Sequence, residues 1–114
     1  MMVIDSYRFG EMVVDGKAYQ ADLVIYPDRI DASWWRKTGH EVCLDDLQDI
    51  LVAQPEYLVV GTGNPGLMEV LPETQEYLAE HDIDLIVEPT ARAYQTYNEL
   101  CASKRVIGAF HLTC

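Results

Sequence analysis

Basic residues are scarce in this chain. Eight lysines and arginines stand against nineteen aspartates and glutamates among 114 residues, which gives a formal net charge of −11. A chain with this charge and no basic stripe is repelled by the phosphates of nucleic acids. The composition therefore argues against a nucleic-acid-binding protein. Solubility is the simplest reason for the acidity, and a cationic partner stays open.

Cysteines and long apolar segments are also rare. Cys43, Cys101 and Cys114 show no CxxC spacing, which fits a reducing compartment better than a disulfide scaffold. No window approaches the roughly 20 apolar residues that a membrane span needs, and residues 1–8 lack the apolar core of a signal peptide. We expect a soluble, cytoplasmic protein that does not contact a membrane.

Signatures of catalysis and of metal binding are missing as well. The sequence contains no Gly-x-Ser-x-Gly elbow, no recognisable Ser-His-Asp order and no paired-carboxylate pattern. His40 and Cys43 form a His-x-x-Cys pair, but two ligands do not make a metal site and no second pair is evident. We therefore predict no metal and no cofactor, and the sequence does not decide whether the protein is an enzyme.

What the chain does contain is the composition of an ordinary globular protein. It is 49% hydrophobic and 24% charged, and its length suits one α/β domain over residues 1–114. The organising feature is the apolar run from Tyr57 to Val60, which enters the glycine-rich turn Gly61–Gly66. Apolar residues without polar alternation indicate a strand buried on both faces, which is typical of parallel sheets covered by helices. Ligands of such sheets bind at the carboxyl ends of the strands, where this turn lies.

The rest of the chain predicts a hairpin, a short strand and then three helices that alternate with three strands. Asp15-Gly16 is a two-residue hairpin signal between arms that lie within residues 7–26. The expected elements are a third strand over residues 30–35, helices over 44–51, 72–81 and from 90 to the basic pair 104–105, and strands over 57–60, 83–87 and 106–112. Residues 56–87 should form a β-α-β unit.

Several single residues carry narrower expectations. Only one of Trp34 and Trp35 can enter the core, since neighbouring strand residues face opposite sides. Thr90 is expected to cap the third helix, and Gly108 to let a helix approach the last strand closely. His111, near the end of that strand, is interpreted as an ordinary strand residue.

The turn supports three interpretations. Gly61-x-Gly63-x-x-Gly66 matches the dinucleotide-binding fingerprint, but Pro65 removes an amide, residues 67–71 separate the last glycine from the helix, and the chain leaves no room for a substrate domain. NAD or FAD binding is therefore disfavoured. The turn could instead expose amides as a small anion nest, to which Thr62 and Asn64 would add side-chain donors. The third interpretation is a tight turn that needs positive φ and binds nothing.

The densest positive cluster is Arg36-Lys37-Thr38-Gly39-His40, directly after the tryptophans. Its nitrogens could receive an anion, because a guanidinium presents paired donors in one plane. The simpler alternative is that Arg36 forms an internal ion pair while Lys37 is solvated. His40 alone is more often a hydrogen-bonded structural residue than a base.

Taken together, these pieces resemble a known family along nearly the whole chain. The residues that carry the likeness are Phe9-Gly10, Trp35-Arg36, Gly39-His40, Gly61-Thr62-Gly63, Thr90-Ala91, Thr96-Tyr97-Asn98-x-Leu100 and Arg105-Val106. In this order they resemble the domain of unknown function 498, the Mth-type domain, a family that includes the third assembly factor of mitochondrial complex I and an adipogenesis-associated protein. The resemblance implies a three-layer α/β fold with a central mixed sheet and an added β-hairpin. The mitochondrial assembly role is not transferred to this chain.

Two hypotheses for function follow. The first is a binding or assembly-type module whose crevice at the Gly61–Gly66 turn docks a protein partner or a small anionic ligand. The second is a small enzyme acting on an anionic metabolite, with Arg36 holding charge, the Gly61–Gly63 amides holding an oxyanion and His40 moving a proton. The candidate ligand-binding residues are Arg36, His40, Gly61, Thr62, Gly63 and Asn64. Homodimerisation stays open.

Overall fold

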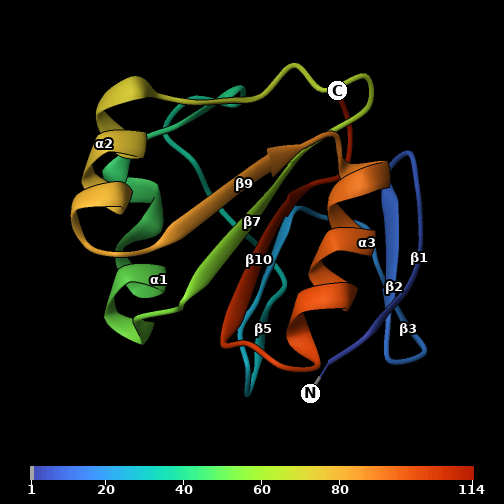
Figure 1. The fold of residues 1–114 in the computed structure, drawn as a ribbon. Coiled ribbons are helices and arrows are strands. Elements are labelled where there is room, and N and C mark those ends of the chain that lie inside the picture. Colours follow the sequence, from blue (N-terminus) through green and yellow to red (C-terminus); the bar gives the residue numbers. More distant parts are fainter. Residues whose placement is uncertain (1) are drawn as a thin grey trace.

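A computed structural model describes residues 2–114 as an α/β fold in three layers (Figure 1). In chain order the elements are β1 (Ile4–Arg8), β2 (Glu11–Val14), β3 (Lys17–Tyr19), β4 (Leu23–Ile25), β5 (Ile30–Asp31), β6 (Glu41–Val42), the 3-10 turn η1 (Leu44–Leu47), α1 (Gln48–Ala53), β7 (Tyr57–Thr62), β8 (Glu69–Val70), α2 (Pro72–Glu80), β9 (Asp84–Glu88), α3 (Thr90–Cys101) and β10 (Val106–His111). The predicted order of hairpin, short strand and alternating helices and strands is confirmed.

The middle layer is a five-stranded mixed sheet in the order β5-β4-β10-β7-β9. β7 lies parallel to both β10 and β9, whereas β4 runs antiparallel to β10. Leu58, Val59 and Val60 are completely buried, because both faces of β7 are covered. The prediction of a parallel strand buried on both sides is therefore confirmed.

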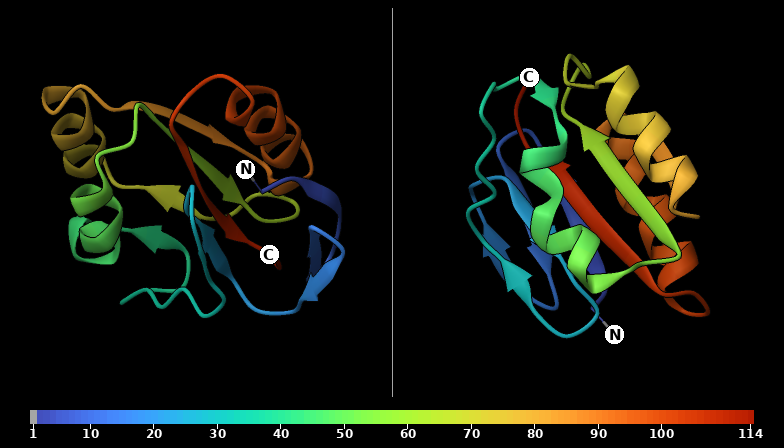
Figure 2. Two further views of the ribbon diagram at one scale, coloured as in Figure 1. Left: turned by 90° about the horizontal axis from the view of Figure 1, so that it is seen from below. Right: turned by 90° about the vertical axis from the view of Figure 1, so that its left-hand side faces the viewer.

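Two layers cover this sheet (Figures 1 and 2). Leu58 and Val60 belong to the core under α1 and α2, which also contains Ile50 and Leu78. Val59 points the other way, into a core shared with α3 and the small sheet β1-β2-β3. Successive residues of one strand thus anchor both outer layers, as the period-two geometry of a strand requires.

The hairpin signal is correct, but its second arm is shorter than predicted. Asp15 and Gly16 have φ values of 48° and 81°, the geometry of a tight two-residue turn between β2 and β3. The arm ends at Tyr19, and β4 joins the main sheet instead. Leu23, Val24 and Ile25 are all buried, so this segment is covered on both faces and cannot remain in a hairpin with one wet side.

The third strand is also shorter than predicted, since β5 covers two residues and the segment up to Trp35 is irregular. Trp34 is 8% exposed and Trp35 is 72% exposed. The expectation that one tryptophan enters the core and the other stays outside is confirmed.

The helix boundaries follow local chemistry. Pro72 is the first residue of α2, where its missing N–H costs nothing. α1 begins only after a 3-10 turn and ends before Gln54, which adopts a left-handed conformation. β7, α2 and β9 form the predicted β-α-β unit, while the short pair β6 and β8 was not predicted.

Gly108 allows close approach, as expected. A Cβ atom at this position would lie 2.9 Å from Cδ1 of Tyr97, which projects from α3 and is 1% exposed. Burial raises the pKa of Tyr97 far above its usual value, so this phenol stays protonated. Within residues 2–114, the helices are all too short or too polar to cross a lipid bilayer.

Candidate functional site

The side chain of Arg36 is buried, although the residue lies in an irregular segment. Its side chain is 6% exposed, and Nη2 donates to Oδ2 of Asp22 at 2.8 Å and to the carbonyl of Gly39 at 2.9 Å. The guanidinium also lies 4.7 Å from the Trp34 ring. The internal ion pair that the sequence left as an alternative is therefore present, whereas Lys37 pairs with Asp45 at the surface.

Asp22 joins Arg36 to the end of the last strand. Its Oδ2 contacts Nδ1 of His111 at 2.8 Å, and its Oδ1 accepts the amide of Leu112 at 2.9 Å. Burial by itself raises the pKa of Asp22, but hydrogen bonds from His111, Leu112 and Arg36 outweigh it and hold the pKa below its usual value. Asp22 is thus a carboxylate that fixes two nitrogen-bearing side chains.

His111 is the centre of the cluster. Its Nδ1 is 3.2 Å from Nη2 of Arg36, and its ring meets the ring of His40 edge to face with centroids 5.7 Å apart. Thr62 is its neighbour across the β7–β10 ladder. A Cβ atom on Gly63 would lie 2.7 Å from Cδ2 of His111, so only glycine leaves room for the imidazole. The structure therefore brings Arg36, His40, Thr62 and Gly63 together around His111, and the interpretation of His111 as an ordinary strand residue is corrected.

Two nitrogen atoms in this cluster have no hydrogen-bond partner within residues 2–114. They are Nη1 of Arg36 and Nε2 of His111, and both are buried. The side chains that carry them are 6% and 8% exposed and touch each other. An unpaired buried polar group costs about 1 to 3 kcal/mol, so such atoms are normally satisfied by an ordered water or a ligand.

The glycine turn itself is built differently from the predicted anion nest. The amide of Gly63 donates to Oγ1 of Thr90 at 2.8 Å, and the amide of Asn64 donates to the carbonyl of Thr113 at 2.9 Å. Thr62 Oγ1 donates to the carbonyl of Glu88 at 3.2 Å. These donors hold the turn against α3 and the chain end, so the interpretation of the turn as an open nest of free amides is corrected.

Gly61 serves packing in the same way. It lies within β7, opposite Phe110 of β10 and Glu88 of β9. A Cβ atom there would approach Oγ1 of Thr90 to 2.7 Å. Of the candidate residues, Gly61 therefore packs against Thr90, and Asn64 lies at the exposed rim of the turn.

Thr90 has a role other than the predicted one. The residue that precedes α3 is Pro89, and Thr90 is the first residue of the helix. Its Oγ1 accepts from Gly63 and donates to the carbonyl of His111 at 2.6 Å. Thr90 therefore joins α3 to the ends of β7 and β10, and the predicted helix cap is wrong.

The sequence did not predict Asp22 or His111 as site residues, because neither is distinctive within its own segment of the chain. The signal for His111 was nevertheless present: adjacent parallel strands end at the same edge of a sheet, so the last residue of β10 lies beside the turn after β7. Asp22 gives a weaker signal, as a carboxylate directly before the apolar run of β4. Nothing in the spacing of Asp22 and Arg36 indicates their ion pair.

A metal site is not formed by these residues. Within residues 2–114, no three His, Cys, Asp or Glu side chains are arranged to hold a metal ion. The arrangement consists of a guanidinium and an imidazole that one carboxylate fixes, and each carries one buried nitrogen without a hydrogen-bond partner among residues 2–114. Such a pair suits a small group that accepts a hydrogen bond from the guanidinium.

Comparison with known proteins gives the same fold over nearly the whole chain. Residues 4–111 match the model of a family described as protein of unknown function (DUF498/DUF598). A conserved hypothetical protein of Pyrococcus horikoshii OT3 is 33% identical, with a TM-score of 0.84 over 97% of this chain and 98% of that one. A protein named MT938 is 28% identical, with a TM-score of 0.83 and full coverage of both chains. A Bordetella parapertussis protein is 26% identical, with a TM-score of 0.82 over 96% of this chain and 94% of that one.

Proposed function

Since the chain belongs to the DUF498/DUF598 family, whose description assigns no activity, we propose a function from the site itself: a binding module that holds a small anionic group between Arg36 and His111. The observation that carries this proposal is the pair of unpartnered nitrogens on two side chains that are each more than nine-tenths buried. The cluster lies at the carboxyl ends of β7 and β10, where ligands of open α/β sheets bind.

The charges of the cluster support an anion in particular. Asp22 pairs with Arg36, and the guanidinium keeps its N–H donors because it does not lose its proton in proteins. The unpartnered Nη1 of Arg36 is therefore a charge-assisted donor, the kind of group that binds an oxygen of a carboxylate or a phosphate, and the His111 ring lies directly beside this guanidinium. His40 is exposed, and its ring meets the His111 ring edge to face.

The test is a titration followed by NMR of the histidine side chains. Inorganic phosphate and succinate are the probes, and the signals of His111 and His40 should shift saturably with either or both. Arg36→Met, which keeps the apolar stem, should abolish these shifts. Arg29→Met is the matched control, because Arg29 is a largely exposed arginine that also stacks on an aromatic ring. If a buried water alone satisfies the two nitrogens, the wild-type spectra will not respond to either probe, and the proposal is then wrong.

The enzyme alternative uses the same residues. One observation favours it: Asp22 orients the His111 imidazole and leaves Nε2 unpartnered, as a carboxylate does for a catalytic base. His111 is then a better candidate than His40 for moving a proton, and Arg36 would hold the charge of the metabolite. The internally bonded Gly63 amide cannot hold an oxyanion. Conversion of carboxylate or phosphate esters by the wild type, lost in His111→Gln but kept in His81→Gln, would support this alternative.

A protein partner and a cytoplasmic location stay predictions. An assembly role would require a docking surface in addition to the site. Because this protein is acidic, such a surface would favour a positively charged partner.

A further inference from the structure

The main sheet has an unpaired edge at β9. Within residues 2–114, β9 pairs with β7 alone and is the last strand on its side of the sheet. A strand in a parallel pair turns only half of its N–H and C=O groups toward its neighbour, so the outward half faces solvent. In Figure 1 no other segment lies along the free side of β9, between α2 and α3.

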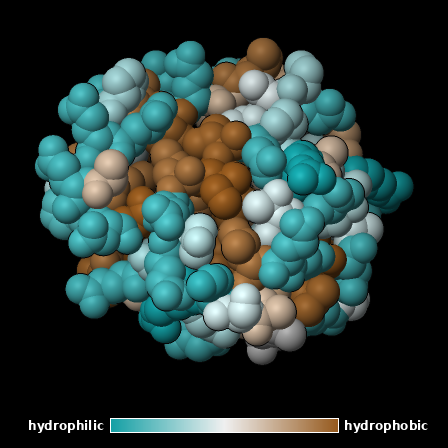
Figure 3. Space-filling view, in the orientation of Figure 1, coloured by the Kyte–Doolittle hydropathy of each residue, from teal (hydrophilic) through white to brown (hydrophobic). Residues whose placement is uncertain are grey.

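Apolar side chains surround this edge. Val87 is 43% exposed, and its neighbours Leu85 and Ile86 are only partly buried. Figure 3 shows the resulting hydrophobic area, ringed by hydrophilic residues, over β9 beside α2. A hollow of about 490 Å³ continues it between β9 and α2, where Leu85 and Val87 face Gln75 and Ala79. An added strand would therefore find both backbone partners and a place for alternate side chains.

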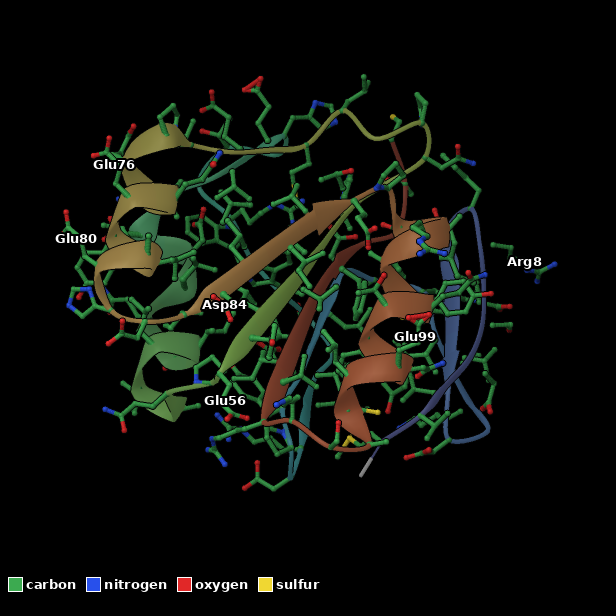
Figure 4. All side chains as sticks on the ribbon, viewed as in Figure 1. Arg8, Glu56, Glu76, Glu80, Asp84 and Glu99 are labelled. Atoms are coloured by element: carbon green, nitrogen blue, oxygen red, sulfur yellow. The ribbon has the colours of Figure 1, made fainter. Side chains whose placement is uncertain are left out.

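The rim of the edge is acidic. Asp82 and Asp84 stand at one end of β9 and Glu88 at the other. α2 contains Glu73, Glu76 and Glu80 and no basic residue; Figure 4 shows Glu76 and Glu80 on the outer side of this helix and Asp84 at the start of β9. Arg92, 3.6 Å from Glu88, is the basic side chain paired with this rim. An approaching segment therefore meets a negative field.

This charge argues against a second copy of the chain as the occupant. Two β9 strands related by a two-fold axis run antiparallel, and with Ile86 on the axis Asp84 of each copy would face Glu88 of the other. Like charges placed directly opposite each other destabilise a strand pair. Each copy also carries a net charge of −11, so the two chains repel each other at long range.

We propose that β9 accepts an added strand from a cationic partner, an extended segment with apolar residues at alternate positions and lysine or arginine at its ends. The backbone of β9 supplies the hydrogen bonds, Leu85 and Val87 contact the apolar side chains, and the acidic rim selects the basic ends. The rim that repels copies of this chain thus selects its partner. This surface is separate from the Arg36 and His111 site.

The experiment uses the full chain and a designed peptide that alternates valine with threonine and carries two lysines at each end. NMR amide signals of residues 84–88 should shift saturably, and the outward amides of β9 should become protected from hydrogen exchange. A peptide with glutamates in place of the lysines should not bind, nor should a lysine peptide with a central proline.

Val87→Asp separates apolar docking from simple charge attraction. It adds a negative charge but removes the apolar contact, and it should weaken binding of the lysine peptide about tenfold, the equivalent of about 1.4 kcal/mol. Val52→Asp is the matched control, because Val52 is an 82% exposed valine on α1, and it should leave binding unchanged. Four results would each overturn the proposal. They are tighter binding of the lysine peptide by Val87→Asp, equal binding of the glutamate and lysine peptides, NMR amide shifts at residues outside β9 in place of residues 84–88, and self-association of the free protein through β9.

Discussion

At the scale of single residues, the site depends on one carboxylate. Asp22 accepts hydrogen bonds from Arg36, His111 and the Leu112 amide, and its side chain is 19% exposed. Without this carboxylate the guanidinium of Arg36 would stay buried with its charge unbalanced. Removal of one partner from a buried ion pair is expensive for this reason, even where the pair as a whole adds little stability.

Asp22→Asn should lower the free energy of unfolding by about 3 kcal/mol at neutral pH. The pKa of Asp22 is lowered in the folded protein, so its stabilising contribution is complete above the unfolded pKa, about 4, and is lost as the pH falls through the folded value. In urea unfolding at several pH values, the difference in stability between wild type and variant should therefore begin to shrink below about pH 4 and disappear only below the folded pKa of Asp22.

The control for this prediction is Asp28→Asn. Asp28 also contacts an arginine, Arg29, but its side chain is 79% exposed, so its removal should change stability by less than about 0.5 kcal/mol. Equal losses in the two variants would show that the Asp22 cluster is no stronger than a surface ion pair.

Gly63 is required by space as well as by backbone conformation. Its φ is +95°, and a Cβ atom would lie 2.1 Å from the carbonyl oxygen of Thr113 and 2.7 Å from His111. Gly63→Ala should destabilise the protein by at least about 3 kcal/mol and move the His111 signals. Gly10, with φ +83° and nothing within 4 Å of its Cβ position, is the control, and Gly10→Ala should cost about 1 to 2 kcal/mol. Thermal unfolding of both variants measures these losses of stability. Similar losses in Gly63→Ala and Gly10→Ala would show that the close contacts at Gly63 add nothing to the cost of its positive φ.

At the scale of elements, Thr90 couples α3 to the ends of two strands. Its hydroxyl accepts from the Gly63 amide after β7 and donates to the His111 carbonyl of β10, and the residue is completely buried. The start of the helix, the glycine turn and the end of the last strand therefore share one hydroxyl group. This contact explains why a threonine stands at this position without capping the helix.

Thr90→Val keeps the shape but leaves the Gly63 N–H and the His111 C=O unsatisfied. We expect a loss of about 2 to 3 kcal/mol in the free energy of unfolding and faster hydrogen exchange at Gly63. Thr74→Val is the comparison: Thr74 is equally buried, but its hydroxyl makes one bond, to the Val42 carbonyl at 3.2 Å, and that carbonyl also accepts from Leu71. A larger loss for Thr74→Val than for Thr90→Val would contradict the coupling.

At the scale of the whole molecule, the net charge of −11 opposes compactness. In one-to-one pairs the eight basic side chains can match at most eight of the nineteen carboxylates, so at least eleven carboxylates are left to repel each other. Sodium chloride screens this repulsion, since the Debye length falls from about 30 Å at 0.01 M to about 3 Å at 1 M. The melting temperature should therefore rise with sodium chloride in scanning calorimetry, and a fall would show that attractive ion pairs prevail over the repulsion. The same salt series is measured on Asp22→Asn, which keeps all the exposed carboxylates of the wild type. Glycerol does not serve as the control, because it carries no charge and does not screen.

The sequence by itself determined the architecture. The apolar run of β7, the Asp15-Gly16 turn, Pro72 at the start of α2 and Gly108 against α3 each act through local period, backbone conformation or the absence of a Cβ atom, which can be seen in a few neighbouring residues. The tertiary structure was needed to place β4, which is buried on both faces and therefore belongs to the main sheet and not to the hairpin. It was also needed to find the short strands β6 and β8, which form by pairing with each other.

Only the tertiary structure decided the site. Arg36, Asp22 and His111 come from three separate parts of the chain, and Asp22 and His111 lie 89 positions apart in the sequence. No local pattern indicates that their side chains meet. The glycine turn had the clearest local signal, but its Gly63 and Asn64 amides donate hydrogen bonds to other groups of the protein. Local interactions therefore specify the backbone of this protein. Which hydrogen-bond donors of the site lack a partner depends instead on contacts between residues that are distant in the sequence.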